Sequence, residues 1–458
     1  MRPGRTSQAM ALASVIALAS LAACSSSGGG STDSGKLKLS VVSLLPGSEK
    51  AAFDTFNARV AAFEKANPNI DVQPHEYKWE ATTFASQLAG GTLPDVFEIP
   101  LTDAGTLIAN GQLADLDGQF QKLPEASQFN TNLLGKGKGE DGHVYAIPAK
   151  SIYGVALHYN RALFQQAGLD PDKPPTTWDE VRADAKIIKD KTGVAGYAMM
   201  ASGATGGWQL TAAIYSRGGR VQQVQKNGTY KSTLDNDAAS KQLELLKEMR
   251  WQDNSVLADT TLAWDTINQA FAAGQVGMYT SGSDVYTNLV ETYGVTGQDY
   301  GLTALPLEGP DSGVLVGGTL AAVSAKADKA AKEAAMKWID FYYLQNLLDE
   351  KQAVENAKVR ADGKQAVGTP VLPIFSREQY QQSLQWIQPY INVPLDHMKG
   401  YTDVMFDQPI VGEPTRATQE IYTLLSTPVQ AVLTDRNANV GQLLKTADTQ
   451  AQALLDKG

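Results

Sequence analysis

Residues 142–181 read GHVYAIPAKSIYGVALHYNRALFQQAGLDPDKPPTTWDEV, and the fold is decided in this stretch. The alternating residues His143–Ile147 predict a short strand. Pro148 is expected to end that strand, because proline cannot donate a hydrogen bond to a neighbouring strand. A second strand is expected over Tyr153–Tyr159, where apolar and aromatic residues dominate. The segment between the two strands is then expected to carry the chain across from the first strand to the second.

Helix signals follow the second strand. Asn160 suits the N-cap of a short helix, Arg161–Ala167, and Gly168 suits the residue that ends it. Thr177 and Glu180 have the spacing of a capping box, in which each side chain bonds to the backbone N–H of the other residue. These signals predict helix, loop and helix, which is the ordinary wiring of an α/β fold.

The chain before this stretch alternates strands and helices in the same way. Strong apolar runs predict strands, and apolar residues spaced by three and four predict helices. The order predicts a parallel sheet with right-handed crossovers. The expected elements are a strand at Leu37–Leu45, a helix at Glu49–Ala66, a strand at Ile70–Tyr77, a helix at Thr82–Leu88 and a strand at Leu93–Glu98.

The motifs in residues 142–181 resemble the core of the family 1 extracellular solute-binding proteins of ABC importers, the group that includes maltose-binding protein. That family shows G-x-x-Y-x-(I/L)-P, then YN, then LF-x-x-AGL, then P-x-TW-x-E. Further resemblance lies in LPDVFE (Leu93–Glu98), FAAGQVGM (Phe271–Met278) and YGLTALP (Tyr300–Pro306). The matching residues of the first stretch are Gly142, Tyr145, Ile147, Pro148, Tyr159, Asn160, Leu163, Phe164, Ala167, Gly168, Leu169, Pro175, Thr177, Trp178 and Glu180.

The resemblance covers nearly all of residues 36–458 and implies an α/β fold with two lobes, like the type II periplasmic-binding proteins. A ligand cleft would lie between the lobes, with hinges near Ala149–Ser151 and Tyr300–Pro306. The implied boundaries are a signal peptide at 1–23, a flexible tether at 24–35, a first lobe at 36–149 plus 305–345, and a second lobe at 150–304 plus 346–458.

The N-terminus has the features of a secretory signal. The apolar run Met10–Leu21 is too short to span a bilayer as a mature helix. The sequence Leu21–Cys24 (LAAC) resembles the lipobox of bacterial lipoproteins, which implies a lipid on Cys24 and anchoring at the extracytoplasmic face of the cell membrane. The alternative is an unlipidated signal that is cut near Ala23. Residues 25–35 are rich in Ser and Gly, which predicts a flexible tether.

Composition excludes several other classes of protein. The 458 residues carry a net charge of −10 without a basic cluster, so nucleic acid is not an expected partner. Cys24 is the only cysteine, so no disulfide framework is expected. The histidines lack metal-ligand spacing, and His158 is expected to be a core residue. Gly137–Gly142 matches GxGxxG but precedes a strand, so we interpret it as a surface turn. We expect no metal and no cofactor.

A sugar site needs flat rings for the C–H faces of the sugar and polar groups for its hydroxyl edges. Trp208 follows the pair Gly206–Gly207 at an expected helix start, and the resemblance places it near a stacking aromatic. Contact with a ligand and packing in the core both remain open for Trp208. Trp264 and Tyr401 are further stacking candidates, whereas Trp178 is expected to be structural.

Polar candidates come from loops that the resemblance places at the carboxyl ends of strands, where open α/β sheets bind ligands. Glycines there would let a ligand approach the backbone. The ligand-binding candidates in these loops are Ser48, Glu49, Glu98, Lys150, Tyr153, Ser281, Ser283, Gly317 and Gly318.

The resemblance therefore implies a substrate-binding lipoprotein of an ABC importer. It would act as a monomer, catalyse nothing, capture a mono- or oligosaccharide and deliver it to the membrane permease. Pro100 and Ser281–Asp284 depart from the maltose-binding pattern, so maltose itself is not the expected ligand. One alternative is the same scaffold carrying a glycerol phosphoester or a polyamine. Another is a secreted glycoside hydrolase, which would need two carboxylates facing each other across a cleft.

Overall fold

The computed structural model describes residues 35–79 and 81–457, so Cys24 and the expected signal peptide lie outside the described residues. The strands are β1 (Leu37–Val42), β2 (Ile70–His75), β3 (Val96–Pro100), β4 (Ala146–Asn160), β5 (Ala195–Tyr197), β6 (Gln222–Val224), β7 (Tyr230–Ser232), β8 (Val276–Gly282), β9 (Tyr300–Ala304), β10 (Val314–Val323) and β11 (Ile410–Gly412). Nine of them form one sheet in the order β2-β1-β3-β10-β4-β8-β5, with β9 beside β4 and β11 beside β10.

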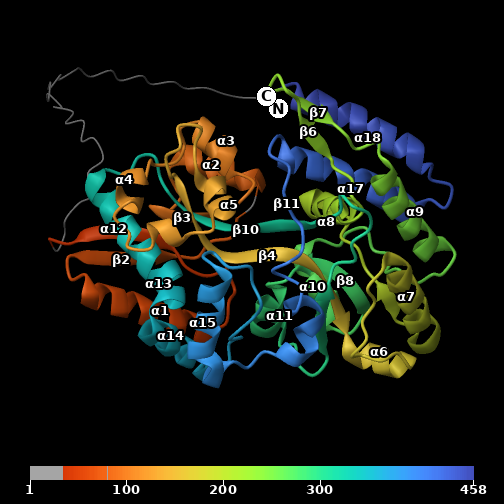
Figure 1. The fold of residues 1–458 in the computed structure, drawn as a ribbon, viewed down its shortest axis with the longest axis horizontal. Coiled ribbons are helices and arrows are strands. Elements are labelled where there is room, and N and C mark those ends of the chain that lie inside the picture. The colour runs from red at the N-terminus through yellow and green to blue at the C-terminus, as the bar shows by residue number, and fades with distance from the viewer. Residues whose placement is uncertain (1–34, 80, 458) are drawn as a thin grey trace, which may run out of the picture.

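Helices surround this sheet, and Figure 1 shows the elements gathered into two lobes, left and right, that β4 and β10 join. No helix in the described ranges is long and apolar enough to cross a membrane. The helices are α1 (Lys50–Ala66), α2 (Ala81–Gly90), α3 (Ala104–Ala109), α4 (Asp117–Phe120), α5 (Thr131–Leu134), α6 (Arg161–Ala167), α7 (Trp178–Thr192), α8 (Gly203–Ser216), α9 (Asp237–Trp251), α10 (Trp264–Ala272), α11 (Val285–Tyr293), α12 (Lys329–Ile339), α13 (Gln345–Leu348), α14 (Glu350–Asp362), α15 (Arg377–Ile387), α16 (Lys399–Thr402), α17 (Thr418–Thr434) and α18 (Val440–Leu455).

The first lobe contains the predicted parallel strands. β1 pairs in parallel with both β2 and β3, and α1 connects β1 to β2. β10 then lies antiparallel beside β3 and brings a distant part of the chain into this sheet. The expected elements between Leu37 and Glu98 are therefore confirmed, with ends that differ by a few residues.

β4 is one strand of 15 residues, so the prediction of two strands interrupted at Pro148 was wrong. Pro148 lies opposite Leu320 of β10, and the pairing shifts register between Leu320 and Thr319. An irregularity of this kind lets a strand include a residue that has no N–H. The strand consequently runs from the first lobe into the second.

The second lobe grows from the far half of β4, which pairs antiparallel with β8 on one edge and β9 on the other. The predicted helix signals are confirmed here. The Asn160 side chain accepts a hydrogen bond from the Leu163 N–H, and Gly168 ends α6 in the left-handed conformation. Thr177 and Glu180 form the predicted capping box at the start of α7.

The C-terminal part of the chain contacts both lobes. α14 packs against α1 and α15, whereas α17 packs against α8 and α9. The lobe boundaries expected from the sequence stay a prediction. From this packing we propose that residues 350–387 belong to the first lobe and that residues 418–455 belong to the second.

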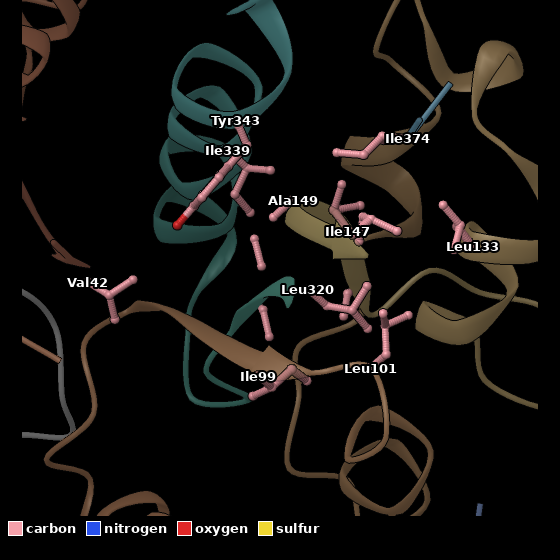
Figure 2. Close-up of a cluster of buried hydrophobic side chains, with 14 of the residues drawn as sticks. Val42, Ile99, Leu101, Leu133, Ile147, Ala149, Leu320, Ile339, Tyr343 and Ile374 are labelled. Carbon is pink, nitrogen blue, oxygen red and sulfur yellow. The ribbon is translucent and has the colours of Figure 1, made fainter. Parts of the chain in front are cut away.

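The core divides into two clusters of buried apolar side chains that meet along β4. Figure 2 shows part of the first cluster, in which Ile99 of β3, Ile147 of β4 and Leu320 of β10 point toward the same interior. His158 is fully buried in β4, as expected, and its Nδ1 lies 2.7 Å from the Tyr300 hydroxyl. Trp178 is also buried and donates to Ser216, which confirms its structural role.

Candidate functional site

The crossing strands bring two of the predicted site residues close together. Lys150 of β4 pairs with Thr319 of β10. Beyond an irregularity in the pairing, Tyr153 pairs with Gly317. A Cβ at Gly317 would lie 2.3 Å from the Tyr153 hydroxyl, so only glycine leaves room for this ring. Gly317 was expected to let a ligand approach the backbone, and the structure instead places the Tyr153 ring of this chain against it.

An aromatic pair lies beside this crossing. The rings of Tyr153 and Trp208 meet edge to face, with centroids 6.2 Å apart and an interplanar angle of 80°. Both side chains are half-buried. Two rings that keep part of their surface in water can offer an apolar face to a further molecule.

The glycines before Trp208 have a different role from the one that the sequence suggested. α8 begins at Gly203, so Gly206 and Gly207 lie inside it. A Cβ at Gly207 would lie 1.9 Å from the Tyr422 carbonyl oxygen. The pair therefore allows α17 to approach α8, and Trp208 is half-buried where the two helices meet the crossing strands.

Two carboxyl groups from different lobes interact with each other, and one of them, Glu413, also contacts Trp208. Glu413 follows β11, and its side chain accepts hydrogen bonds from the Tyr422 hydroxyl, at 3.2 Å, and from Trp208. Asp103 follows β3 in the first lobe and accepts from Thr102 at 3.1 Å and from Gln419 of α17. The site therefore combines rings and acceptors from both lobes.

Burial dominates the electrostatics of these carboxyl groups. It raises the pKa of Glu413 to about 8, and the hydrogen bonds from Tyr422 and Trp208 lower it only in part. Burial also raises the pKa of Asp103 to about 6. Asp103 raises the pKa of Glu413 further, and Glu420 raises the pKa of Asp103, because like charges repel. The nearby Lys136 acts in the opposite direction on Glu413.

The predicted residues Glu98 and Lys150 form a second polar group in the first lobe. The Lys150 ammonium lies 2.7 Å from Glu98 Oε1, and the Tyr343 hydroxyl donates to the same oxygen at 2.7 Å. Lys150 also lines a cavity of about 310 Å³ between β4 and the helices of this lobe. Glu98 and Lys150 therefore belong to the hydrogen bonding of the first lobe, and Lys150 also borders this cavity.

Four other predicted residues lie in buried surroundings. Ser281, Ser283 and Tyr401 are fully buried, and the Ser283 hydroxyl donates to the Pro370 carbonyl at 3.2 Å. Gly318 is buried at the bulge between Lys150 and Tyr153, where a Cβ would lie 2.6 Å from the Ile152 side chain.

The remaining candidates lie near the surface. Ser48 and Glu49 belong to the turn before α1, where the Ser48 hydroxyl donates to the Leu45 carbonyl. Trp264 starts α10 and is half-buried, beside Asp265. Asp265 pairs at 2.7 Å with Lys78, which follows β2 in the other lobe. The structure thus gathers Tyr153, Trp208 and Gly317. Ser281 and Ser283 flank Gly282, where a Cβ would lie 2.8 Å from the Tyr153 ring. Glu98 and Lys150 form a separate pair.

Sequence reasoning missed Asp103, Glu413 and Tyr422. Asp103 comes after the strand LPDVFE, and that strand signal could have directed attention to the loop behind it. Glu413 follows a strand of three residues in the region of weakest resemblance, so no local signal pointed to it. Among the described residues, no group of three or more His, Cys, Asp or Glu side chains could hold a metal ion.

Comparison with known proteins defines the class of this one. Two lobes joined by crossing strands, with polar and aromatic side chains between them, is an arrangement typical of proteins that capture small molecules. The chain belongs to the bacterial extracellular solute-binding protein family, whose model matches residues 46–345. The resemblance seen in the sequence is therefore confirmed.

Individual relatives are distant. The chain is 24% identical over 297 residues to the sn-glycerol-3-phosphate-binding periplasmic protein UgpB of Salmonella typhimurium, and the match covers 61% of this chain and 65% of that protein. It thus spans about two thirds of the length of that curated relative.

Solved structures support the fold over most of the chain. An ABC-transporter solute-binding protein from Thermotoga lettingae, bound to alpha-D-tagatose, has a TM-score of 0.71 at 19% identity, covering 92% of this chain and 100% of that one. A substrate-binding protein from Listeria monocytogenes, in complex with cycloalternan, has a TM-score of 0.70 at 21% identity, covering 92% and 98%. The predicted α/β fold with two lobes is therefore confirmed.

Proposed function

We propose that this chain is the substrate-binding component of an ABC importer, which captures a carbohydrate between its lobes and presents it to the permease in the membrane. The observation that carries the proposal is the group formed by Tyr153, Trp208, Glu413 and Asp103. Its rings and carboxyl groups come from both lobes and meet at the strands that join them. A ligand held there would contact both lobes.

The chemistry of this group suits a sugar. The rings offer apolar surface to the C–H face of a pyranose, and the carboxyl oxygens accept hydrogen bonds from hydroxyl groups. The structural neighbours named above were solved with tagatose and cycloalternan, which are carbohydrates. We further propose that the chain catalyses no reaction, so incubation with oligosaccharides should yield no products.

A glycerol phosphoester is the second candidate ligand, because the curated relative from Salmonella is a glycerol-3-phosphate-binding protein. A phosphate group prefers cations and backbone N–H groups. Asp103 and Glu413 are carboxyl groups, and Lys136 is the cation that acts on Glu413. The group around Trp208 therefore favours the neutral sugar, and a thermal-shift screen containing both ligand classes would decide.

Replacing Trp208 by Ala tests the carbohydrate proposal. Aromatic anchors commonly cost about 2 kcal/mol of binding free energy when they are truncated. That loss corresponds to a roughly thirtyfold weaker affinity. We expect calorimetric titration of Trp208→Ala with a sugar from the screen to show this loss, with a small change in the melting temperature of the free protein.

Trp251→Ala is the matched control. Trp251 lies at the end of α9, and its indole N–H donates to the Val432 carbonyl at 2.8 Å, away from the crossing strands. This variant should keep the affinity of the unchanged protein. Normal affinity in Trp208→Ala, together with a large fall in melting temperature, would identify Trp208 as a packing residue and contradict the proposal.

We also propose that Cys24 carries a lipid that anchors the protein at the extracytoplasmic face of the cell membrane. The lipobox-like sequence LAAC and the Ser/Gly-rich residues after it support this proposal. Cys24→Ser should release the protein into the medium or leave the precursor uncleaved, as cell fractionation and mass spectrometry would show. Membrane association that persists in this variant would argue against the anchor.

A further inference from the structure

A cavity of about 310 Å³ lies on the first-lobe side of the crossing strand. Its walls come from α1, α14, α15, the crossing strand β4 and the π-helical turn Asp340–Leu344, with Glu291 of α11 reaching it from the second lobe. Ligand pockets usually measure about 300–1,000 Å³. This cavity is at the lower end of that range, which suits a molecule of monosaccharide size.

Four polar atoms in the walls of this cavity are buried and have no hydrogen-bond partner in the structure. Two are donors, Arg59 Nε and Gln379 Nε2, and two are acceptors, Asn346 Oδ1 and Gln365 Oε1. The Gln365 side chain is only 6% exposed. Buried polar groups in proteins nearly always have a partner, because an unmade hydrogen bond in the interior is unfavourable. These four atoms therefore point to a polar occupant.

Two of the three cationic side chains in the cavity wall are paired with carboxylates. Lys150 lies 2.7 Å from Glu98, and Arg360 lies 2.8 Å from Glu291. Arg59 donates to the Phe341 carbonyl at 2.9 Å and lies 4.5 Å from the centroid of the Phe341 ring. An anionic or cationic occupant would have to compete with these partners. A neutral occupant would leave them in place.

We infer that this cavity is a second binding site, separate from the group around Trp208, and that it takes a small neutral polyol. A hydroxyl group donates and accepts at the same time. A chain of hydroxyls can therefore satisfy two donors and two acceptors, and its carbon backbone can lie against the apolar and aromatic wall. The residues of that wall are Leu44, Phe56, Ile152, Leu347, Val371, Leu372, Ile374, Tyr342 and Tyr380.

This site would be coupled to the arrangement of the lobes. Arg360 belongs to α14, and Glu291 belongs to α11 beyond the crossing, so their ion pair joins elements of the two lobes in the cavity wall. A polyol bound beside this pair contacts both lobes at once. It would favour the arrangement of the lobes in which the pair is formed, because a ligand stabilises the state that it binds better.

Calorimetric titration with D-mannitol and D-glucose as neutral probes tests the inference. In the double variant Gln365→Leu/Gln379→Leu, we expect at least a tenfold loss of affinity for the probe that binds the unchanged protein. The single variant Asn346→Leu changes α13, which packs against α15, and should show a similar loss. Gln365→Leu/Gln379→Leu removes two unpaired buried polar atoms, so this variant should melt no lower than the unchanged protein. Asn346→Leu also loses the 2.8 Å hydrogen bond from Asn346 Nδ2 to the Tyr342 carbonyl, so its affinity is measured below its own melting temperature.

Two controls separate this site from the one proposed above. Gln382→Leu changes an exposed residue of α15 and should keep the affinity for the probe. Trp208→Ala should keep it as well, since Trp208 does not line the cavity. Loss of the probe in Trp208→Ala with retention in the double variant would place the polyol in the cleft and overturn the inference, while leaving the carbohydrate proposal intact.

Two further results would also overturn it. Absence of heat with both neutral probes would mean that the cavity holds water only. Tighter binding of D-gluconate than of D-mannitol would show that the site selects an anion. Neither result bears on the affinity change expected for Trp208→Ala with its own sugar, so the two proposals can fail independently.

Discussion

Glu413 and Asp103 are acidic groups whose surroundings favour their protonated form. Burial raises the pKa of Glu413 from an ordinary value near 4.5 to about 8, and that of Asp103 to about 6. The groups that act on Glu413 are Tyr422, Trp208, Asp103 and Lys136. At neutral pH the folded protein therefore holds a proton on Glu413 that the unfolded chain has released.

This difference predicts how stability depends on pH. Between about pH 4.5 and pH 8 the folded state binds more protons at Glu413 than the unfolded state, so stability falls as pH rises. One proton contributes at most about 1.4 kcal/mol per pH unit. Glu413→Gln removes this contribution, so its melting temperature should fall less than that of the unchanged protein across this window, as a series of thermal melts would show.

Glu140→Gln is the control for this experiment, since Glu140 is an exposed acid in the turn before β4. It should follow the pH dependence of the unchanged protein. If the melting temperatures of Glu413→Gln and of the unchanged protein change with pH to the same extent, Glu413 is ionised in the folded state.

The capping residues could be predicted because their partners are near in the chain. Asn160 and Thr177 bond to N–H groups three residues away, so their roles follow from local spacing. Trp208 and Glu413 lie far apart in sequence and meet because α17 packs on α8. No local pattern encodes that contact, which is why Glu413 was missed and the role of Trp208 was left open.

At the scale of elements, helices were predictable because their caps and apolar stripes are local features. β4 was not, because its continuity through Pro148 depends on a register shift in its pairing with β10. The sequence assigned residues 346–458, which include α14 and α17, to the second lobe on resemblance alone, since both are amphipathic helices that could cover either lobe. Their placement depends on which apolar surface remains uncovered when the rest of the chain has folded.

The capping box of α7 gives a prediction at this scale. Thr177 accepts from the Glu180 N–H at 3.1 Å, and Glu180 accepts from the Thr177 N–H at 3.1 Å. Replacing an N-cap threonine by alanine costs about 0.5–2 kcal/mol. We expect Thr177→Ala to lower the free energy of unfolding, measured in urea, by about 1 kcal/mol.

Thr423→Ala serves as the comparison, because Thr423 is an exposed residue in the middle of α17 that bonds only to the carbonyl of Gln419. Alanine has the higher helix propensity, so this variant should be neutral or slightly stabilised. Equal stability of the two variants would contradict a capping role for Thr177.

At the scale of the whole molecule, the lobes touch at places beyond the crossing strands. Lys78 pairs with Asp265 at 2.7 Å, and Arg360 pairs with Glu291 at 2.8 Å. Two lobes joined by a few strands can hinge, and such contacts form or break as they do. A ligand held between the lobes should favour the arrangement in which these pairs are formed.

Solution scattering can detect this closure. A sugar that binds with high affinity should reduce the radius of gyration toward about 22 Å, the value for a compact chain of this length. The Trp208→Ala variant at the same sugar concentration should stay closer to its unliganded value. Tight binding without any compaction in the unchanged protein would exclude a hinge motion.

The position of β10 has a consequence for the order in which the chain folds. β10 lies between β3 and β4, although it follows them by a long stretch of sequence that forms most of the second lobe. A growing chain therefore cannot complete the first sheet until Val323 has been synthesised. Closing so long a loop makes folding slow, and the strands made first keep an open edge in the meantime. Folding of the first lobe is consequently expected only late in synthesis, after β10 has been made.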